Sequence, residues 1–165
     1  FARAGKAVRI EPAQIDSTQC TRQDTIKLAS LSTAKLNEEE TRCAIAARLF
    51  MWEHNVVQPA ARQHLGEPVA EILHFGSYSC RTIRGSSATS EHATANAFDI
   101  SGFRLSSGKL VSLKQQWQGS QPEAEFLKEV RDGACDYFNV VLSPDYNADH
   151  HDHLHVDMGW YRTCR

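Results

Sequence analysis

The chain has 165 residues, with 18 Lys and Arg against 20 Asp and Glu, and 41% of its residues are hydrophobic. This length and apolar fraction favour one globular domain and argue against wholesale disorder. The formal net charge of -2 argues against a nucleic-acid-binding protein, and the sequence has no run of about 18 apolar residues that would span a membrane.

The first 36 residues are polar and mixed. We expect an irregular segment there, with one short strand at residues 7–10, that packs on or leads into a domain spanning residues 37–165. A helix is predicted to begin at Asn37, because three glutamates follow this N-cap candidate and complement the helix dipole. Its apolar face would carry Ile45, Leu49 and Trp52. Pro59 then opens a second short helix that ends near Gly66.

The rest of the chain predicts strands around one further helix. We expect a strand over residues 69–78, a polar loop over 80–89, a hairpin formed by 95–105 and 109–113, and strands at 139–142 and 153–158. Pro122 begins a helix whose buried stripe contains Phe126, Leu127 and Val130. Strands and helices do not alternate strictly, so we predict a single α+β domain with a small, mainly antiparallel central sheet and flanking helices. Trp52 and Trp117 are interpreted as core residues.

Five cysteines are scattered along the chain without a C-x-x-C pair, which does not fit a zinc ribbon or a thioredoxin-type site. Cys164 is the penultimate residue, where a disulfide to the body of the fold explains a cysteine better than core packing does. We therefore expect at least one disulfide and, from it, a periplasmic or secreted protein. Five is an odd number, so we expect that one cysteine is free or that its partner was trimmed away, and the connectivity does not follow from the sequence.

Half of the eight histidines lie within residues 150–155. On a strand, His153 and His155 would face the same side, roughly 6.5–7 Å apart along the chain. A second segment contains His92 and Asp99, and a carboxylate flanked by apolar residues needs a partner. The alternatives are a solvated His-rich loop that binds metal opportunistically, a surface histidine and a turn-capping aspartate.

Two imidazole nitrogens and one carboxylate oxygen would suit zinc, and three protein ligands leave a fourth position for water, as in catalytic sites. Zinc lowers the pKa of such a water to about 7 and polarises a substrate carbonyl. His153 is placed to accept the proton of that water. Asp152 is the competing base, and His150 is a weaker third candidate.

These residues resemble a known group of enzymes. Ser90-x-His92-x-x-Ala95-x-Ala97-x-Asp99 is similar to the S-x-H-x-x-G-x-A-x-D signature of zinc D-Ala-D-Ala peptidases, and His153-x-His155 resembles the H-x-H of the lysostaphin, D-Ala-D-Ala metallopeptidase and hedgehog (LAS) group. Over residues 40–165 the chain is most similar to the bacterial extensin-like C-terminal domain family. That similarity is carried by the segments Gln58-Pro-Ala-Ala, Gly76-Ser-Tyr-x-Cys-Arg81, Ser90-Glu-His-Ala-Thr-Ala-Asn-Ala, Val130-Arg-Asp-Gly-Ala-Cys135, Leu142-Ser-Pro-Asp-Tyr-Asn147 and Asp152-His-x-His-x-Asp157.

The resemblance implies one zinc ion held by His92, Asp99 and His155, with His153 next to the catalytic water and peptidoglycan peptides as substrate. It also implies a substrate-contacting arginine, Arg81, for which Arg84 competes. Further candidate substrate contacts are Tyr78, Ser90 and Trp160, with Tyr161 beside Trp160. Asp157 is a candidate for orienting one of the histidines.

Two departures from the pattern matter. Ala95 stands where the signature has Gly, which costs little if the backbone there is an ordinary strand. Position 152 is Asp where the dipeptidase branch has the Glu of E-x-x-H, so we expect His153 to act as the base. For the same reason we expect an endopeptidase rather than a carboxypeptidase, which would cleave either a D,D or an L,D bond. We expect the protein to be a monomer. The alternative from another class is a zinc-stabilised, cell-wall-binding module without catalysis.

Overall fold

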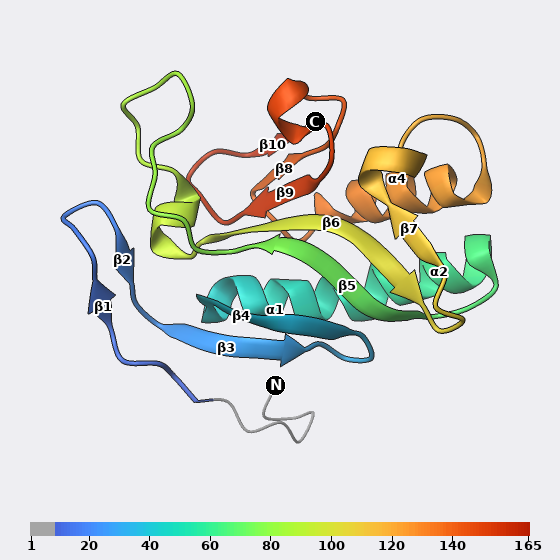
Figure 1. Ribbon diagram of the computed structural model, residues 1–165, viewed down its shortest axis with the longest axis horizontal. Coiled ribbons are helices and arrows are strands. Elements are labelled where there is room, and N and C mark those ends of the chain that lie inside the picture. The colour runs from blue at the N-terminus through green and yellow to red at the C-terminus, as the bar shows by residue number, and fades with distance from the viewer. Residues whose placement is uncertain (1–8) are drawn as a thin grey trace.

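A mainly antiparallel sheet of eight strands forms the centre of the protein in the computed structural model, which describes residues 9–165 (Figure 1). The strand order is β10-β8-β9-β6-β5-β4-β3, and β7 pairs with the outer part of β6. Within the described residues, the pairs β4–β5 and β8–β10 run parallel and the other neighbours in this sheet run antiparallel. The predicted α+β class is confirmed.

The strands are β1 (Gln14–Ile15), β2 (Thr21–Arg22), β3 (Thr25–Ser30), β4 (Lys35–Arg42), β5 (Val69–Gly76), β6 (Ala97–Leu105), β7 (Leu110–Ser112), β8 (Val140–Leu142), β9 (Leu154–Asp157) and β10 (Thr163–Cys164). The α-helices are α1 (Cys43–Trp52), α2 (Gln58–Leu65), α3 (Leu113–Gln116) and α4 (Pro122–Ala134). A π-helical turn, η2 (Glu53–Val57), joins α1 to α2, and short 3-10 turns occur at η3 (Glu91–Thr94) and η4 (Ala148–His150).

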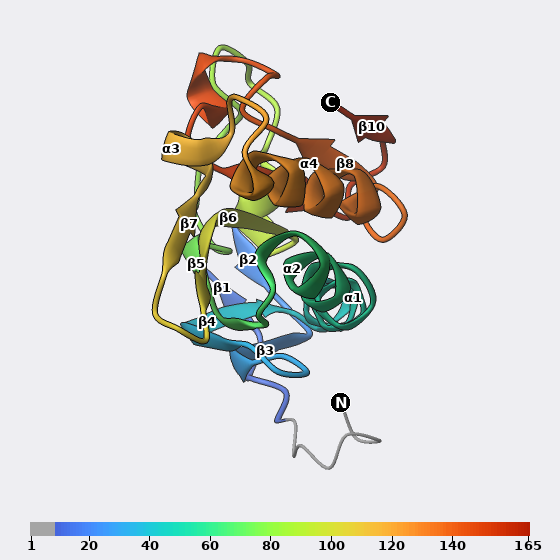
Figure 2. The same ribbon diagram turned by 90° about the vertical axis from the view of Figure 1, so that its right-hand side faces the viewer.

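Helices α1, α2 and α4 gather on one side of the sheet (Figures 1 and 2). The core lies between them and the strands, and Trp52 is at its centre: its ring packs 6.3 Å from those of Phe103 and Phe138. The Trp52 indole also donates a hydrogen bond to the Val130 carbonyl at 2.9 Å, which satisfies its buried N–H and ties α1 to α4. Trp52 and Trp117 are both buried, as predicted.

The helix predicted from Asn37 is wrong at its start, because residues 35–42 form strand β4 and α1 begins at Cys43. The carboxylates that suggest a helix N-terminus bind groups of the neighbouring strands instead. Glu40 accepts hydrogen bonds from Thr25 at 2.6 Å and Arg22 at 3.0 Å, and Glu39 accepts one from the Ser77 N–H at 2.9 Å. Strand pairing on both sides of β4 outweighs the local helix signal.

The segment expected to be irregular contains a strand of the main sheet, β3, and the small β1–β2 hairpin. Residues 26–29 alternate between Ile26 and Leu28, which are buried in the core, and the exposed Lys27 and Ala29. This is the period of two that characterises a half-buried strand. The strand predicted at residues 7–10 lies mostly outside the described residues, but Ile10 forms a single antiparallel bridge with Ile26.

The other predicted elements are confirmed. Helix α2 ends before Gly66, whose φ of 75° gives the left-handed cap that ends many helices. Strands β6 and β7 form the expected hairpin, and α4 begins at Pro122. At Gly102 of β6 a Cβ would lie 2.7 Å from the Val111 carbonyl oxygen, so the close approach of β7 requires glycine there.

Two disulfides join distant parts of the chain, Cys20 to Cys80 and Cys135 to Cys164, and Cys43 is the free cysteine. The prediction that a disulfide ties the chain end to the fold is confirmed at Cys164. None of the described helices combines the length and the apolar character that crossing a bilayer requires.

Candidate metal centre

His92 is presented by the short turn η3, which lies between the loop 77–90 and strand β6. The Ser90 hydroxyl caps this turn by accepting a hydrogen bond from the His92 N–H at 3.3 Å. The Ser79 N–H donates to the His92 carbonyl at 3.0 Å, so the backbone of His92 is held from both sides. The His92 side chain is 3% exposed. Its position is therefore set by packing and hydrogen bonds rather than by solvent.

Asp99 and His155 come from adjacent strands and are direct partners in the antiparallel register of β6 with β9. Partners in such a register point to the same face of the sheet. Asp99 Oδ1 lies 2.8 Å from His155 Nδ1. The sheet therefore brings together two residues that are 56 positions apart in the sequence.

His92, Asp99 and His155 converge on one point in a geometry that fits a small divalent cation. His92 Nε2 lies 3.2 Å from Asp99 Oδ2 and 3.2 Å from His155 Nδ1. Donor atoms bound at about 2.0–2.1 Å around a tetrahedral zinc are roughly 3.3 Å apart. The three side chains predicted as ligands can thus hold a metal with little movement.

Outer partners determine which ring nitrogen of each histidine faces the shared point. His92 Nδ1 donates to the Ser77 carbonyl at 2.8 Å, and His155 Nε2 donates to Asp157 Oδ2 at 3.0 Å. The nitrogen opposite each of these bonds is then free to accept a metal. Such outer hydrogen bonds orient metal-binding histidines and raise their basicity. Asp157 is itself held by the Gly159 N–H at 2.8 Å.

The ionisation of the cluster is strongly coupled. Burial opposes the charge of Asp99, but hydrogen bonds from His155 and His92 hold its pKa far below the usual range. Burial likewise opposes the charge of His155, yet its hydrogen bonds to Asp157 and Asp99 raise its pKa to about 9. In the metal-free protein a proton on His155 Nδ1 therefore lies where a cation would otherwise neutralise Asp99.

His153 lies beside the three candidate ligands. Its Nδ1 is 3.0 Å from Asp152 Oδ1, and its Nε2 is 3.7 Å from Asp99 Oδ1. Because the Asp152 carboxylate accepts the proton on Nδ1, the unprotonated nitrogen of a neutral His153 is Nε2, which faces the cluster. Of the three residues considered as base, Asp152 is placed to orient the His153 ring, and His153 presents Nε2 to the cluster.

His150 adds a further imidazole to the same region. Its ring centre lies 5.1 Å from that of His153 and 5.9 Å from that of His155, and its Nδ1 is 2.7 Å from Asn147 Oδ1. Burial, together with the two neighbouring imidazoles, lowers the pKa of His150 to about 4. His150 is therefore neutral at physiological pH.

The residues predicted to contact substrate differ in their exposure and in their partners. Arg81 is exposed, and Arg84 is exposed and paired with Asp149 of the His-rich loop. The buried Ser90 caps η3, as described above. Trp160 and Tyr161 are 98% and 81% exposed, and neither ring contacts a histidine of the cluster within the described residues.

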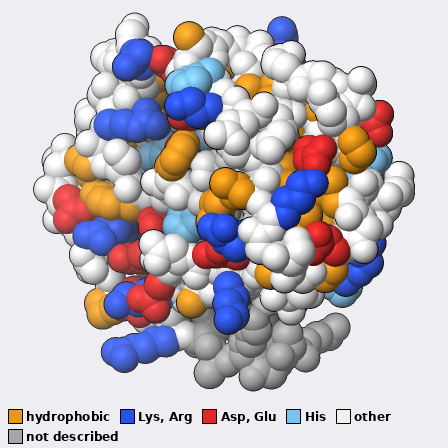
Figure 3. Space-filling view, turned by 45° about the vertical axis from the view of Figure 1, so that its right-hand side comes forward, with side chains coloured by type: hydrophobic (Ala, Val, Ile, Leu, Met, Phe, Trp, Pro, Cys, Tyr) orange, Lys and Arg blue, Asp and Glu red, His pale blue; other side chains and the backbone are white. Residues whose placement is uncertain are grey.

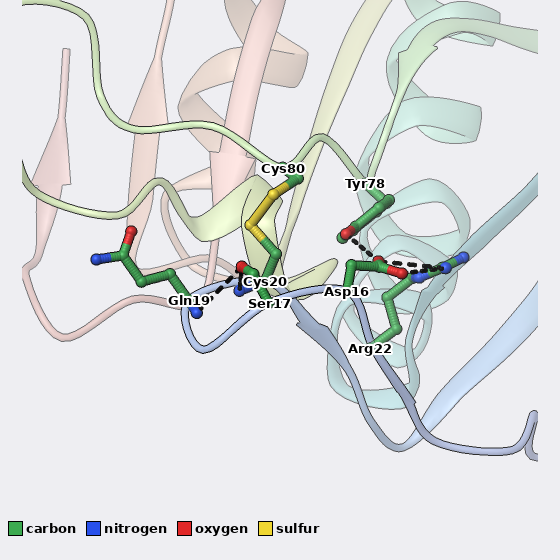
Figure 4. Close-up of a disulfide and its surroundings, with 7 residues drawn as sticks. All are labelled: Asp16, Ser17, Gln19, Cys20, Arg22, Tyr78 and Cys80. Carbon is green, nitrogen blue, oxygen red and sulfur yellow. Dashed lines mark hydrogen bonds and ion pairs between the residues drawn. A yellow bond between two sulfur atoms is a disulfide. The ribbon is translucent and has the colours of Figure 1, made fainter.

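Tyr78 is bound to the N-terminal hairpin rather than to the histidines. Its hydroxyl donates to Asp16, and the Arg22 guanidinium lies 4.5 Å from its ring centre (Figure 4). The disulfide between Cys20 and Cys80 makes a second link between the same two segments. The hairpin thus supports the start of the loop 77–90, which provides the Ser77 carbonyl for His92.

The backbone at Ala95 differs from the expectation of an ordinary strand. Ala95 has φ 53° and ψ 28°, the left-handed conformation in which glycine is favoured, and strand β6 begins two residues later. The reason is local: the Ala95 N–H closes η3 by bonding to the His92 carbonyl at 3.1 Å. The glycine of the signature therefore has a conformational role that alanine fills with strain.

The family of extensin-like protein C-termini matches residues 1–165. The chain belongs to the extensin-like protein C-terminus family. The match includes the first 35 residues, which add little to the resemblance seen in the sequence but which contribute β3 and one half of a disulfide. The comparison with curated proteins found no match, and neither did the comparison with solved structures.

In this extensin-like domain, the outer partner of His92 is the feature that sequence reasoning missed. Ser77 is fully buried, and it uses its carbonyl for His92, its N–H for Glu39 and its hydroxyl for the Ala97 carbonyl at 2.6 Å. A backbone carbonyl has no residue signature. The pattern Gly76-Ser77 signals only a break in the strand, and its role becomes visible once β5 and η3 are placed together.

Proposed function

We propose that this protein is a zinc-dependent peptidase that hydrolyses peptide bonds of peptidoglycan stem peptides or crosslinks. The observation that carries the proposal is the pairing of a three-donor cluster with a separate His153–Asp152 dyad at its side. A site that only stabilised a fold would need the donors alone. The dyad adds a proton acceptor that is aimed at the same point.

The donor set supports zinc as the cation. Two imidazole nitrogens and one carboxylate oxygen are the ligand types that zinc takes, and three protein ligands correspond to an open, catalytic site. When bound, zinc would polarise a substrate carbonyl and lower the pKa of a water molecule to about 7. His92, Asp99 and His155 would hold it, with Ser77 and Asp157 keeping the two imidazoles in the required orientation.

The role of the protein's own groups follows from the hydrogen bonds. Asp152 keeps the proton of His153 on Nδ1, so Nε2 accepts a proton on the side of the cluster. Once His153 is protonated, its imidazolium is stabilised by Asp152 at 3.0 Å and can return the proton to the leaving amine. The general base and the general acid of the proposed hydrolysis are therefore the same side chain.

The substrate class rests on the resemblance to the LAS peptidases and not on a shaped pocket. Peptidoglycan is an extracytoplasmic polymer, and the two disulfides support a periplasmic or secreted location because such bonds persist in oxidising compartments. Arg81 and Arg84 are exposed at the loop that leads to His92, where a guanidinium would suit a substrate carboxylate. We propose endopeptidase action on a D,D or L,D bond.

The experiment compares zinc-loaded wild type with His153→Ala on purified peptidoglycan, with zinc content measured in both and released muropeptides identified by mass spectrometry. We expect release by wild type and a loss of at least about 100-fold in His153→Ala at unchanged zinc content. His54→Ala serves as the matched control, because His54 is exposed on η2. If zinc-loaded wild type releases no muropeptide, the enzyme proposal fails and a non-catalytic wall-binding module becomes the better explanation.

A further inference from the structure

Two exposed aromatic side chains border the candidate metal centre. Phe75, at the end of β5, is 62% exposed, and Tyr146, in the loop before η4, is 47% exposed. Of the large apolar side chains exposed in the described part of the chain, these two have rings in contact with histidines of the site. On the face shown in Figure 3, histidine and apolar side chains lie next to each other.

The two aromatics are the first and last members of a row of four rings, in which each ring contacts the next. The Phe75 ring meets His153 edge-on at 5.8 Å, His153 lies 5.1 Å from His150, and His150 meets Tyr146 edge-on at 5.4 Å. Edge-to-face contacts at these distances favour a defined arrangement of the rings. The proposed proton acceptor is thus inside the row, with one apolar side chain beyond each end of the histidine pair.

The row is ordered by hydrogen bonds as well as by ring packing. The Tyr146 N–H donates to the Ser143 carbonyl at 2.9 Å, and His150 is held by Asn147 at 2.7 Å. Phe75 belongs to β5, whose neighbouring residue Gly76 pairs with Asp99 in the sheet register. Both aromatics are therefore positioned relative to the metal ligands, although folding leaves much of their apolar surface in water.

We propose that Phe75 and Tyr146 determine substrate specificity by packing against apolar side chains of the peptide on the two sides of the attacked bond. This inference rests on the proposed function. A peptide whose carbonyl reaches the cluster next to His153 extends in both directions along the row of rings, so its flanking side chains meet Phe75 at one end and Tyr146 at the other. Covering these rings removes apolar surface from water, which favours apolar over polar flanking residues.

The test uses two peptides that differ only in having Val or Thr on both sides of a central ketomethylene group, which replaces the amide and prevents hydrolysis. Val and Thr have nearly the same shape, so the comparison isolates the apolar contribution. Binding to the zinc-loaded full chain is measured by titration calorimetry. We expect wild type to prefer the Val peptide by about fivefold, a modest value because both rings are half open to water. Phe75→Ala and Tyr146→Ala should each reduce this preference to less than about twofold, and Phe75→Leu should keep most of it.

Leu110→Ala is the matched control. Leu110 is 40% exposed and pairs with Arg104, five residues along β6 from Asp99, which places it roughly 17 Å from the site. The inference is overturned if wild type does not distinguish the peptides or binds neither. It is also overturned if Phe75→Ala and Tyr146→Ala keep the preference, or if either loses stoichiometric zinc. Muropeptide release from purified peptidoglycan is followed separately. A protein that prefers the Val peptide without releasing muropeptides refutes the peptidase and leaves the apolar contacts of Phe75 and Tyr146 in place.

Discussion

Removing the disulfide between Cys20 and Cys80 should destabilise the protein by about 4 kcal/mol. The bond closes a segment with a sequence separation of 60 residues, and the chain-entropy relation gives about 4.3 kcal/mol at 25 °C for a loop of that length. The disulfide between Cys135 and Cys164 closes 29 residues, for which the same relation gives about 3.6 kcal/mol. Cys20 is buried, so alanine is preferred to serine as its replacement.

The assay is urea unfolding followed by tryptophan fluorescence, since Trp52 and Trp117 are both buried in the core. The reference is Cys43→Ala, which removes the free thiol and prevents disulfide exchange. On that background, each cysteine pair is replaced by alanine separately. Tyr78, Asp16 and Arg22 still connect the hairpin to the loop, so the native fold and the slope of ΔG against urea concentration should be retained.

A loss of less than about 1 kcal/mol at unchanged slope would refute the entropic reasoning for the Cys20–Cys80 bond. The entropic reasoning would also be refuted if removing Cys135–Cys164 lowered the free energy of unfolding clearly more than removing Cys20–Cys80, because the disulfide that closes the shorter loop should contribute less. The functional consequence is measured in parallel. Loosening the loop that provides the Ser77 carbonyl should weaken zinc binding in the variant without Cys20 and Cys80, and should leave it unchanged in the variant without Cys135 and Cys164.

Three further outcomes follow from the site. Replacing His92, Asp99 or His155 by alanine should in each case abolish stoichiometric zinc binding, and a variant that retains zinc removes its residue from the ligand set. Asp157→Asn should weaken zinc affinity by about 10- to 100-fold in a competition titration. Ala95→Gly should raise the free energy of unfolding by about 0.5–1 kcal/mol, because relief of the left-handed strain exceeds the added entropy of the unfolded chain; a lower urea midpoint would contradict this. In metal-free protein, His155 has a pKa of about 9, against about 6.5 in the unfolded chain. Protonation of His155 therefore adds up to about 3 kcal/mol to the free energy of unfolding. This contribution is fully present below pH 6.5 and is lost as the pH rises through 9. Urea midpoints of chelated protein across this range test the loss, which zinc-loaded protein should not show.

The extent to which the fold could be predicted depended on whether local signals agreed with tertiary pairing. Helix α4 was predictable because Pro122 and the apolar stripe that follows it indicate the same helix. Strand β4 was not, because Glu39 and Glu40 resemble the first turn of a helix until Ser77, Thr25 and Arg22 are placed beside them. Strand β3 has the alternation of a half-buried strand, but it was not predicted because the residues around it are polar and mixed.

The residues of the candidate site were predictable because His92 and Asp99 lie in one ten-residue segment that resembles a family signature, and His155 lies in a second such motif. The sequence by itself thus predicted a cluster of possible metal ligands, a neighbouring candidate base and an α+β domain with at least one disulfide. Only the tertiary structure decided which cysteines pair, which nitrogen of each histidine faces the cluster, and that Asp152 is hydrogen-bonded to the ring of His153. The orientation of the two imidazoles depends on the register of β6 with β9 and on the backbone of Ser77. Atoms that a fold brings together from distant segments leave no trace in the order of the residues.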